Sequence, residues 1–187
     1  MKLADIPFNM KTSFNESLRE VPEDFEQFRE GIDWLKNKIE ESEHESVERG
    51  VMLSLCGGFS RIVMDLDDSV EQLKEALRIF QTQSKTVPEF VCQIRLAHTY
   101  QYKEDFVTAE GLFLKLLQEL KANPRHACSD YLDYVFQHYG KCLLEMGYLE
   151  KAETLFLKAL ELRLVKGDLE LIESTQKALQ LISTKKS

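Results

Sequence analysis

The chain has 187 residues, 43% of them hydrophobic, and a formal net charge of -8 with an isoelectric point near 5.1. This size and composition suit one ordinary globular domain with a buried core. The acidic balance argues against a broad affinity for nucleic acid or for anionic membranes, because both of these attract cationic surfaces.

The N-terminal stretch MKLADIPFNMKTSF lacks the continuous apolar segment of a secretory signal, because polar residues and Pro7 interrupt it. No segment of the sequence is apolar for long enough to span a bilayer. We therefore expect a cytoplasmic protein that does not engage a membrane. No role is predicted for residues 1–22.

Beyond this stretch, apolar residues recur with a helical period almost throughout, which predicts an all-α fold in which no strand pattern competes. A first helix is expected over residues 23–43. Further helices are expected over about 45–64, 69–83, 86–102, 106–122, 128–146, 149–166 and from 168 onward.

Local signals for helix ends support these boundaries. Ser69 with Gln72, and Thr86 with Glu89, have the spacing of capping boxes that would open two helices. Glycines are expected to end two others in the left-handed conformation, and an aspartate to cap the last helix: Gly147, Gly167 and Asp168.

Small residues recur at matching places in three successive helix pairs. One set lies in the first helix of each pair, at intervals of 40 and 43 residues: Gly57, Ala97 and Gly140. A second set follows twelve residues after each: Ser69, Ala109 and Ala152. A fixed pattern at a fixed offset indicates a structural repeat, in which small residues let the two helices of a pair approach closely.

The third copy resembles the consensus of the tetratricopeptide repeat (TPR) family at Phe136, Tyr139, Gly140, Leu143, Gly147, Tyr148, Ala152, Phe156 and Ala159. The second copy keeps Leu96, Ala97, Tyr100, Ala109 and Phe113, whereas the first is degenerate. The repeat length of about 40 residues resembles the longer TPR variety of motor light chains and bacterial peptide-sensing regulators. The resemblance implies a right-handed superhelical stack of antiparallel helical hairpins, a TPR-like α-solenoid of about eight helices.

The resemblance also divides the chain. Residues 1–44 are expected to form an N-terminal arm and a capping helix. Three repeats are expected over about 45–84, 86–123 and 127–166. A C-terminal helix over 168–183 is expected to shield the last repeat from solvent.

A TPR-like array implies a protein–protein interaction module without catalysis, whose concave groove is lined by the first helix of each repeat. Helix geometry places nine candidate binding residues on that face: Arg61, Arg95, His98, Gln101, Tyr102, Tyr134, Gln137, His138 and Lys141. These aromatic, amide and basic groups would suit a partner peptide or helix with acidic groups. The alternative is an ordinary solvated helix face.

One known ligand class of the family is not expected. The family's clamp for chaperone C-termini needs a Lys and Asn pair in the first repeat, where this chain has Ser54 and Gly58. A second hypothesis is a regulatory TPR protein that acts on a bacterial phosphorelay or transcription factor, although such proteins usually carry more repeats and an effector domain. The open edge of a solenoid can also support a homo-oligomer.

A third hypothesis is a zinc or thiol enzyme, based on the proximity of His126, Cys128, His138 and Cys142. No pair of these has zinc-finger spacing, and Cys142 lies between core positions. Phosphate-loop, dinucleotide and GxSxG motifs are absent from the sequence, so no cofactor, metal or catalytic residue is predicted. The four cysteines contain no CxxC pair and are expected to be free thiols, with a disulfide framework as the alternative: Cys56, Cys92, Cys128 and Cys142.

Overall fold

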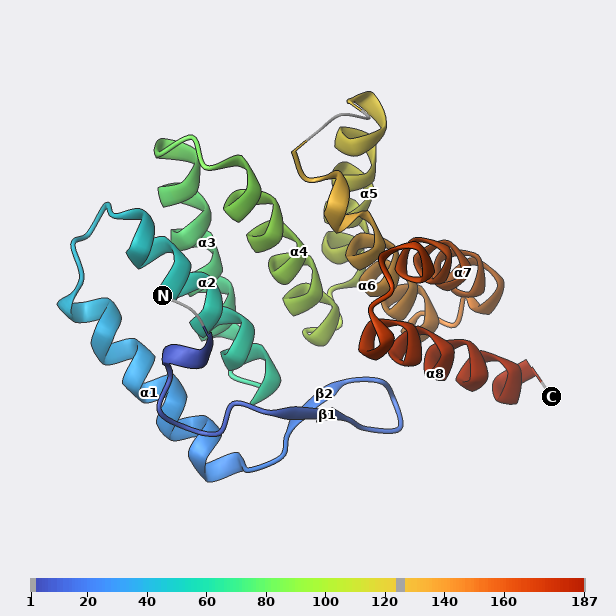
Figure 1. Ribbon diagram of the computed structural model, residues 1–187, viewed down its shortest axis with the longest axis horizontal. Helices are drawn as coiled ribbons and strands as arrows, with labels where there is room; N and C mark the ends of the chain where they lie inside the picture. The colour runs from blue at the N-terminus through green and yellow to red at the C-terminus, as the bar shows by residue number, and fades with distance from the viewer. Residues whose placement is uncertain (1–2, 124–126, 187) are drawn as a thin grey trace. The chain divides into compact units, whose positions relative to one another are not determined.

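The computed structural model describes residues 3–123 and 127–186, and within them the chain is all-α in class, as predicted (Figure 1). These residues contain eight α-helices: α1 (Phe25–Glu41), α2 (Val47–Ile62), α3 (Leu66–Thr82), α4 (Thr86–Tyr102), α5 (Phe106–Ala122), α6 (Leu132–Glu145), α7 (Leu149–Lys166) and α8 (Leu169–Lys186). Two single-turn 3-10 helices accompany them, η1 (Leu3–Asp5) and η2 (Ser129–Tyr131). None of the helices in the described ranges combines the length and apolar character needed to traverse a bilayer.

The chain forms two compact units, residues 1–103 and residues 104–187. The first unit holds α1 to α4, and the second holds α5 to α8. The division falls between α4 and α5, which the repeat pattern pairs in its second copy. The repeat boundaries given above stay a prediction.

In the first unit, α2 packs against α1, α3 and α4. A Cβ atom at Gly57 would lie 2.6 Å from Leu73 Cγ and 3.1 Å from the carbonyl oxygen of Ser69. The Ser69 hydroxyl donates a hydrogen bond of 2.6 Å to the Gly57 carbonyl. The prediction that small residues allow close approach within a helix pair is therefore confirmed here.

The two predicted capping boxes are wrong. Helix α3 begins at Leu66, so Ser69 lies inside the helix. Its hydroxyl donates a hydrogen bond to α2 and does not cap α3. Gln72 accepts a hydrogen bond from Ser60 of α2. At α4 the N-cap residue is Lys85, so Thr86 is already the first residue of the helix, and Glu89 accepts a hydrogen bond from Gln81 of α3. Contacts between helices, which a local spacing rule does not see, engage Ser69, Gln72 and Glu89.

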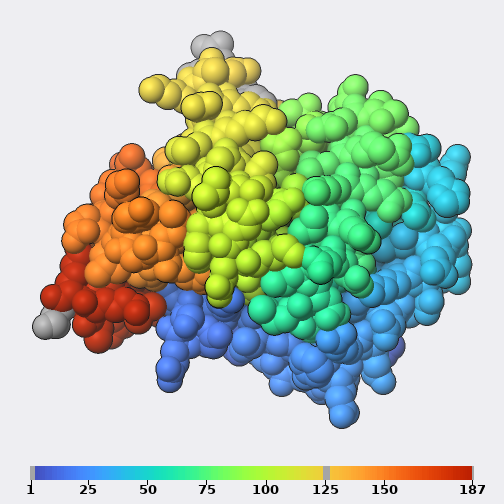
Figure 2. All heavy atoms as spheres, turned by 180° about the vertical axis from the view of Figure 1, so that it is seen from behind, coloured from blue at the N-terminus to red at the C-terminus, as the bar shows by residue number. Residues whose placement is uncertain are grey.

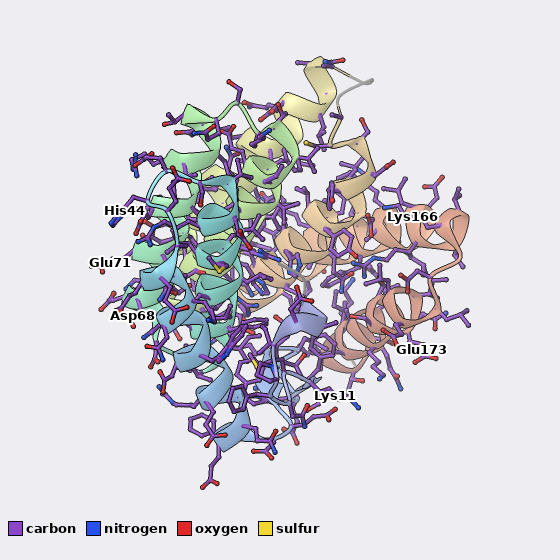
Figure 3. The ribbon with its side chains drawn as sticks, turned by 60° about the vertical axis from the view of Figure 1, so that its left-hand side comes forward. Lys11, His44, Asp68, Glu71, Lys166 and Glu173 are labelled. Carbon is purple, nitrogen blue, oxygen red and sulfur yellow. The ribbon has the colours of Figure 1, made fainter. Side chains whose placement is uncertain are left out.

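Ion pairs at the surface join α1 and its following loop to α3. Arg29 bonds Asp65 and Lys36 bonds Asp68, each at 2.8 Å. Arg78 reaches Glu45 at 2.7 Å. Asp68 and Glu71 point outward from α3 (Figure 3), so this side of the unit is a charged, solvated surface.

In the second unit, α6 packs against α5 and α7, and α7 against α8. A Cβ atom at Gly140 would lie 2.8 Å from Phe156 Cε1, so this pair repeats the close approach seen at Gly57. Gly147 and Gly167 have positive φ angles of 82° and 74°, as predicted for helix stops. The Asp168 carboxylate accepts from the Leu171 amide at 3.1 Å and caps α8, also as predicted.

The N-terminal residues contain two strands that the sequence analysis did not predict. Strand β1 (Thr12–Phe14) pairs antiparallel with β2 (Glu20–Pro22), with Ser13 opposite Val21. The turn between them is organised by Asn15, whose side chain accepts hydrogen bonds from the amides of Ser17 and Arg19. In the space-filling view this blue segment follows the lower border of the first unit's helices (Figure 2).

Candidate functional site

The candidate site is the surface of the first unit where α2 and α4 lie side by side. We call it the α2–α4 face and define it by Ser54 and Arg61 of α2 with Arg95, His98 and Tyr102 of α4. Arg95 links the two helices, because its Nη1 donates a 2.7 Å hydrogen bond to the Ser54 hydroxyl.

Tyr102 lies at the centre of this face. The Arg61 guanidinium carbon is 4.6 Å from the centroid of the Tyr102 ring, and the His98 ring meets it edge-on at 5.1 Å. Cations over an aromatic ring are attracted by its negative face. The face thus joins basic and aromatic groups in the combination that the sequence analysis expected of a binding surface.

The β1–β2 hairpin lies on the α2–α4 face. The Glu20 amide donates to the Tyr102 hydroxyl oxygen at 2.9 Å, and Arg61 Nη2 donates to the Glu20 carboxylate at 2.6 Å. Arg19 places its guanidinium carbon 4.8 Å from the Tyr102 ring centroid. An extended segment of the chain is therefore held on the face by a backbone hydrogen bond, an ion pair and a cation–π contact.

The electrostatics of this contact follow from burial and from Glu20. Burial raises the pKa of the Tyr102 hydroxyl, and the Glu20 carboxylate raises it further while Arg61 opposes the shift. Burial would lower the pKa of Arg61, but Glu20 and Tyr102 outweigh it and the pKa is raised. Both side chains therefore keep their neutral-pH states, a neutral phenol and a guanidinium cation.

Arg61 is only partly satisfied by the hairpin. Arg61 as a whole is 6% exposed. Its Nε and Nη1 atoms are buried with no hydrogen-bond partner among the described residues. Glu20 is bonded through Nη2. A buried guanidinium with spare N–H groups can donate to a further carboxylate or carbonyl oxygen.

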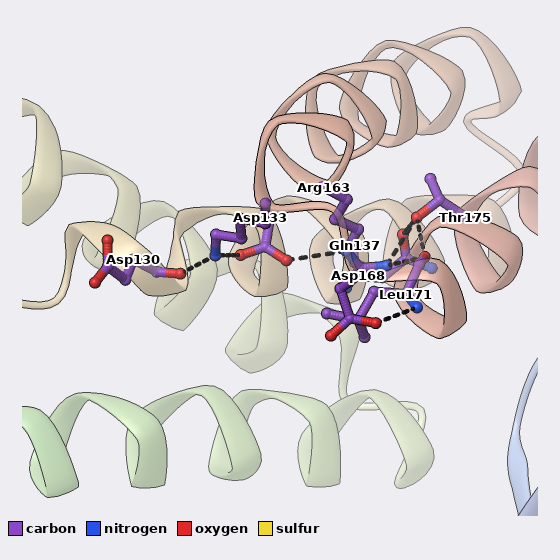
Figure 4. A network of polar contacts seen from close by, with 8 residues as sticks. Asp130, Asp133, Gln137, Arg163, Asp168, Leu171 and Thr175 are labelled. Carbon is purple, nitrogen blue, oxygen red and sulfur yellow. Dashed lines mark hydrogen bonds and ion pairs between the residues drawn. The ribbon is translucent and has the colours of Figure 1, made fainter.

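The second unit has a polar network that joins α6, α7 and α8 (Figure 4). Asp133 of α6 accepts from Arg163 Nε at 2.9 Å and from Lys166 Nζ at 2.6 Å, both on α7. Arg163 Nη1 continues to the Thr175 hydroxyl of α8 at 2.7 Å, which lies 3.1 Å from Gln137 Oε1. The side chains of Asp133 and Arg163 are 0% and 2% exposed, so this is a buried ion pair that joins three helices.

The structure distributes the nine candidate residues over both units. In the first unit it brings Arg61, His98 and Tyr102 together, with Arg95 beside them. Arg61, His98, Tyr102 and Gln101 are all buried and not solvent-facing as expected, because neighbouring elements, including the hairpin, cover them. In the second unit Gln137 belongs to the buried network, and the Tyr134 ring lies 5.5 Å from the Arg163 guanidinium carbon. His138 is half-buried and Lys141 is buried. Their membership of one continuous groove stays a prediction.

Several residues of these two clusters were not predicted. Glu20 and Arg19 escaped notice because strands of three residues are too short to show a periodicity. Asp133, Arg163 and Thr175 look like ordinary polar residues of amphipathic helices. The turn residue Asn15 was the one local signal for the hairpin, and by itself it does not place the hairpin on α2 and α4.

Zinc and thiol chemistry receive no support from the described residues. No three His, Cys, Asp or Glu side chains in residues 3–123 and 127–186 group as metal ligands, and His126 lies outside the described residues. The four cysteines are free and buried, as predicted. Burial raises the pKa of Cys56 and Cys92 to about 11 and that of Cys142 to about 12. Such thiols remain protonated and unreactive at neutral pH.

Comparison with known structures confirms the fold. BtubC (BKLC) from P. vanneervenii superposes with a TM-score of 0.56 over 84% of this chain and 74% of its own, at 14% sequence identity. The nearly identical TPR-like repeats of a protein from Podosopora anserina, described as a kinesin light chain, superpose with a TM-score of 0.56 at 12% identity, over 87% of this chain and 90% of that one. Neither a family profile nor a curated protein sequence matches. At these identities the likeness establishes a TPR-like helical repeat fold.

Proposed function

We propose that this chain, with its TPR-like helical repeat fold, is a protein-interaction module that binds an extended segment of a partner protein and catalyses no reaction. The observation that carries the proposal is the hairpin contact, in which extended backbone lies against Arg61 and Tyr102. A surface that holds its own extended segment through a backbone hydrogen bond and an ion pair has the chemistry needed to hold a foreign one.

The proposed contact residues are those expected from the sequence: Arg61, Arg95, His98, Gln101, Tyr102, Tyr134, Gln137, His138 and Lys141. The guanidinium groups among them would favour a partner that carries acidic groups, because complementary charges steer association and fix register. The chain as a whole is acidic, so such selectivity would come from this local basic surface.

Partner capture tests the proposal. Proteins retained from an extract of the native host by the immobilised full chain would be identified by mass spectrometry, and the Kd of the purified partner measured by calorimetry. We expect Arg95→Glu on the α2–α4 face to weaken binding at least about tenfold, because it replaces attraction by repulsion. Circular dichroism would verify that the variant is folded.

The matched control is Arg78→Glu on the outer surface of the same unit, where Arg78 is exposed and pairs with Glu45. This variant should bind like the unmodified chain. The proposal fails if Arg78→Glu loses the partner while Arg95→Glu keeps it, since the binding surface would then lie on the outer side.

The same capture separates the regulatory alternative from a general scaffold, because a phosphorelay protein or transcription factor would be identified directly. A second copy of the chain among the retained proteins would indicate self-association. We also propose a cytoplasmic location, which the four buried free thiols support because a reducing compartment keeps thiols unpaired.

A further inference from the structure

We propose that residues 12–22 are an internal ligand of the α2–α4 face, and that the partner displaces them with an extended segment that places a carboxylate on Arg61. This depends on the function proposed above and specifies the chemistry of the partner. It also implies that binding is a competition between two segments for one surface.

The hairpin has the character of a ligand more than of a core element. No side chain of residues 11–22 is buried, and the Glu20 carboxylate is 24% exposed. Its two strands pair with each other, and its turn is closed by Asn15, so its internal hydrogen bonds do not depend on α2 or α4. The segment can therefore leave the face without breaking a hydrogen bond inside the hairpin.

The chain on either side of the hairpin is fixed. Ile6 and Met10 are buried, and a Cβ atom at Gly31 of α1 would collide with Met10 Sδ, so the segment before the hairpin lies directly on α1. After the hairpin, the Asp24 carboxylate caps α1 by accepting from the Gln27 amide. These two anchors let the hairpin swing from the face while the rest of the N-terminal segment stays in place.

The unused hydrogen-bond donors of Arg61 explain how a partner segment could displace the hairpin. Glu20 engages Arg61 through Nη2, and the buried Nε and Nη1 atoms have no hydrogen-bond partner within the described residues. A carboxylate that approaches the Nε edge of a guanidinium forms two parallel hydrogen bonds. A partner carboxylate in that position would bond Nη2 and also Nε, a donor that the hairpin leaves unused.

Tethering decides how strongly the hairpin competes. A segment joined by a short connection acts at an effective concentration on the order of millimolar, so it masks the face from weak ligands. If the face is open about 1% of the time, the apparent affinity for a partner falls about a hundredfold. Weakening the hairpin should restore that affinity.

Binding of a peptide to the full chain tests whether the hairpin competes for the α2–α4 face. The probe is a fluorescent synthetic peptide with the sequence of residues 11–23, KTSFNESLREVPE, whose Kd is measured by anisotropy. The recipient variant combines Asn15→Ala with Glu20→Gln, which weakens the hairpin turn and its ion pair and leaves α2 and α4 unchanged. The matched control is Glu45→Gln, which removes an exposed ion pair elsewhere in the first unit.

We expect the peptide to bind the hairpin variant at least about tenfold more tightly than the unmodified chain or Glu45→Gln. A probe with Glu20→Gln should lose at least about tenfold on the same variant, and adding Tyr102→Phe to the recipient should weaken binding of the original probe. Equal affinity for the hairpin variant and the unmodified chain would overturn the competition while leaving a peptide-binding face. No binding to any of them would mean that the hairpin is a fixed part of the fold, and the proposed function would then be judged by partner capture alone.

Hydrogen exchange of the unmodified chain provides a measurement that needs no variant. The paired amides of β1 and β2 should exchange at least about tenfold faster than the amides of α2. Their exchange rate should not rise at low concentrations of denaturant, because the hairpin opens locally and exposes little new surface. If the hairpin amides and the α2 amides both exchanged only when the whole first unit unfolds, the proposal would be overturned.

Discussion

In the first unit, Arg61 of α2 and Tyr102 of α4 meet a surface hairpin, whereas in the second unit Asp133 and Gln137 of α6 meet buried side chains of α7 and α8. Both contacts contain an arginine–carboxylate pair. The Glu20 side chain is partly exposed, while the Asp133 side chain is fully buried.

This difference in exposure separates an openable contact from a permanent one. Breaking a buried ion pair leaves a charge without compensation in a medium of low polarity, which is strongly unfavourable. Arg61 is nearly as buried as Arg163, so the two pairs differ at the carboxylate: the Glu20 side chain is 24% exposed, and water can reach it as the hairpin leaves, which lowers the cost of breaking the pair. The buried pair of the second unit is therefore a permanent part of its core, and the contact in the first unit is the one that we propose can open.

The largest expected effect is at Asp133. Asp133→Ala should lower the free energy of unfolding by about 3–5 kcal/mol, because Arg163 would remain buried without its carboxylate. Chemical denaturation followed by circular dichroism measures this loss. Glu153→Ala, which removes the exposed partner of Lys186, should cost less than about 1 kcal/mol. Equal losses for the two variants would remove the distinction between buried and exposed pairs.

Thiol labelling compares the cores of the two units. Cys92 of α4 and Cys142 of α6 should react with a thiol reagent at pH 8 at least about a hundredfold more slowly than in the unfolded chain, because burial raises the pKa of both thiols. Mass spectrometry of labelled peptides reports each cysteine separately. Rapid labelling of Cys92 alone would show that the first unit opens through its core and not through its hairpin.

The raised pKa values of the buried thiols also make the stability of the fold depend on pH. The folded-state pKa of Cys92 is about 11, above the value near 8.5 of an unfolded thiol. The protonated thiol therefore contributes stability that is fully present below about pH 8.5 and is lost as the pH rises towards 11. Unfolding measured from pH 7 to 11 should show stability falling across the upper part of this range.

Glycine substitutions test the close approach inside the first unit. Gly57→Ala should destabilise the chain by about 1–3 kcal/mol, because its new methyl group would press on Leu73 and on the Ser69 carbonyl. Gly111→Ala is the matched control, since no atom lies within 4 Å of a Cβ at that position of α5. It should stabilise by about 0.5–1 kcal/mol through helix propensity, as read from thermal denaturation. A neutral Gly57→Ala would contradict the tight pairing of α2 with α3.

The smallest effect is expected at Glu20. If the hairpin leaves the face as we propose, Glu20→Gln should change the free energy of unfolding by less than about 1 kcal/mol, because the otherwise buried Arg61 is then solvated. Denaturation of this variant beside Asp133→Ala gives the direct comparison. A loss as large as that of Asp133→Ala would make the hairpin as permanent as the buried network.

Local sequence patterns were sufficient for most of the fold. The apolar period placed the helices, and Gly147, Gly167 and Asp168 ended or capped them as expected because these signals act within a few residues. The small residues Gly57 and Gly140 were also recognised, because a repeat displays the same packing requirement more than once.

The sequence by itself therefore determined the helical class and the residues at which helices pair most closely. The tertiary structure alone decided that Ser69 bonds α2 instead of capping α3, that Glu20 meets Arg61 from 41 positions away, and that Asp133 pairs with Arg163 across 30. The physical reason is range: helix periodicity and caps are fixed by neighbours along the chain, whereas polar pairs between elements form only after packing has set where those elements lie.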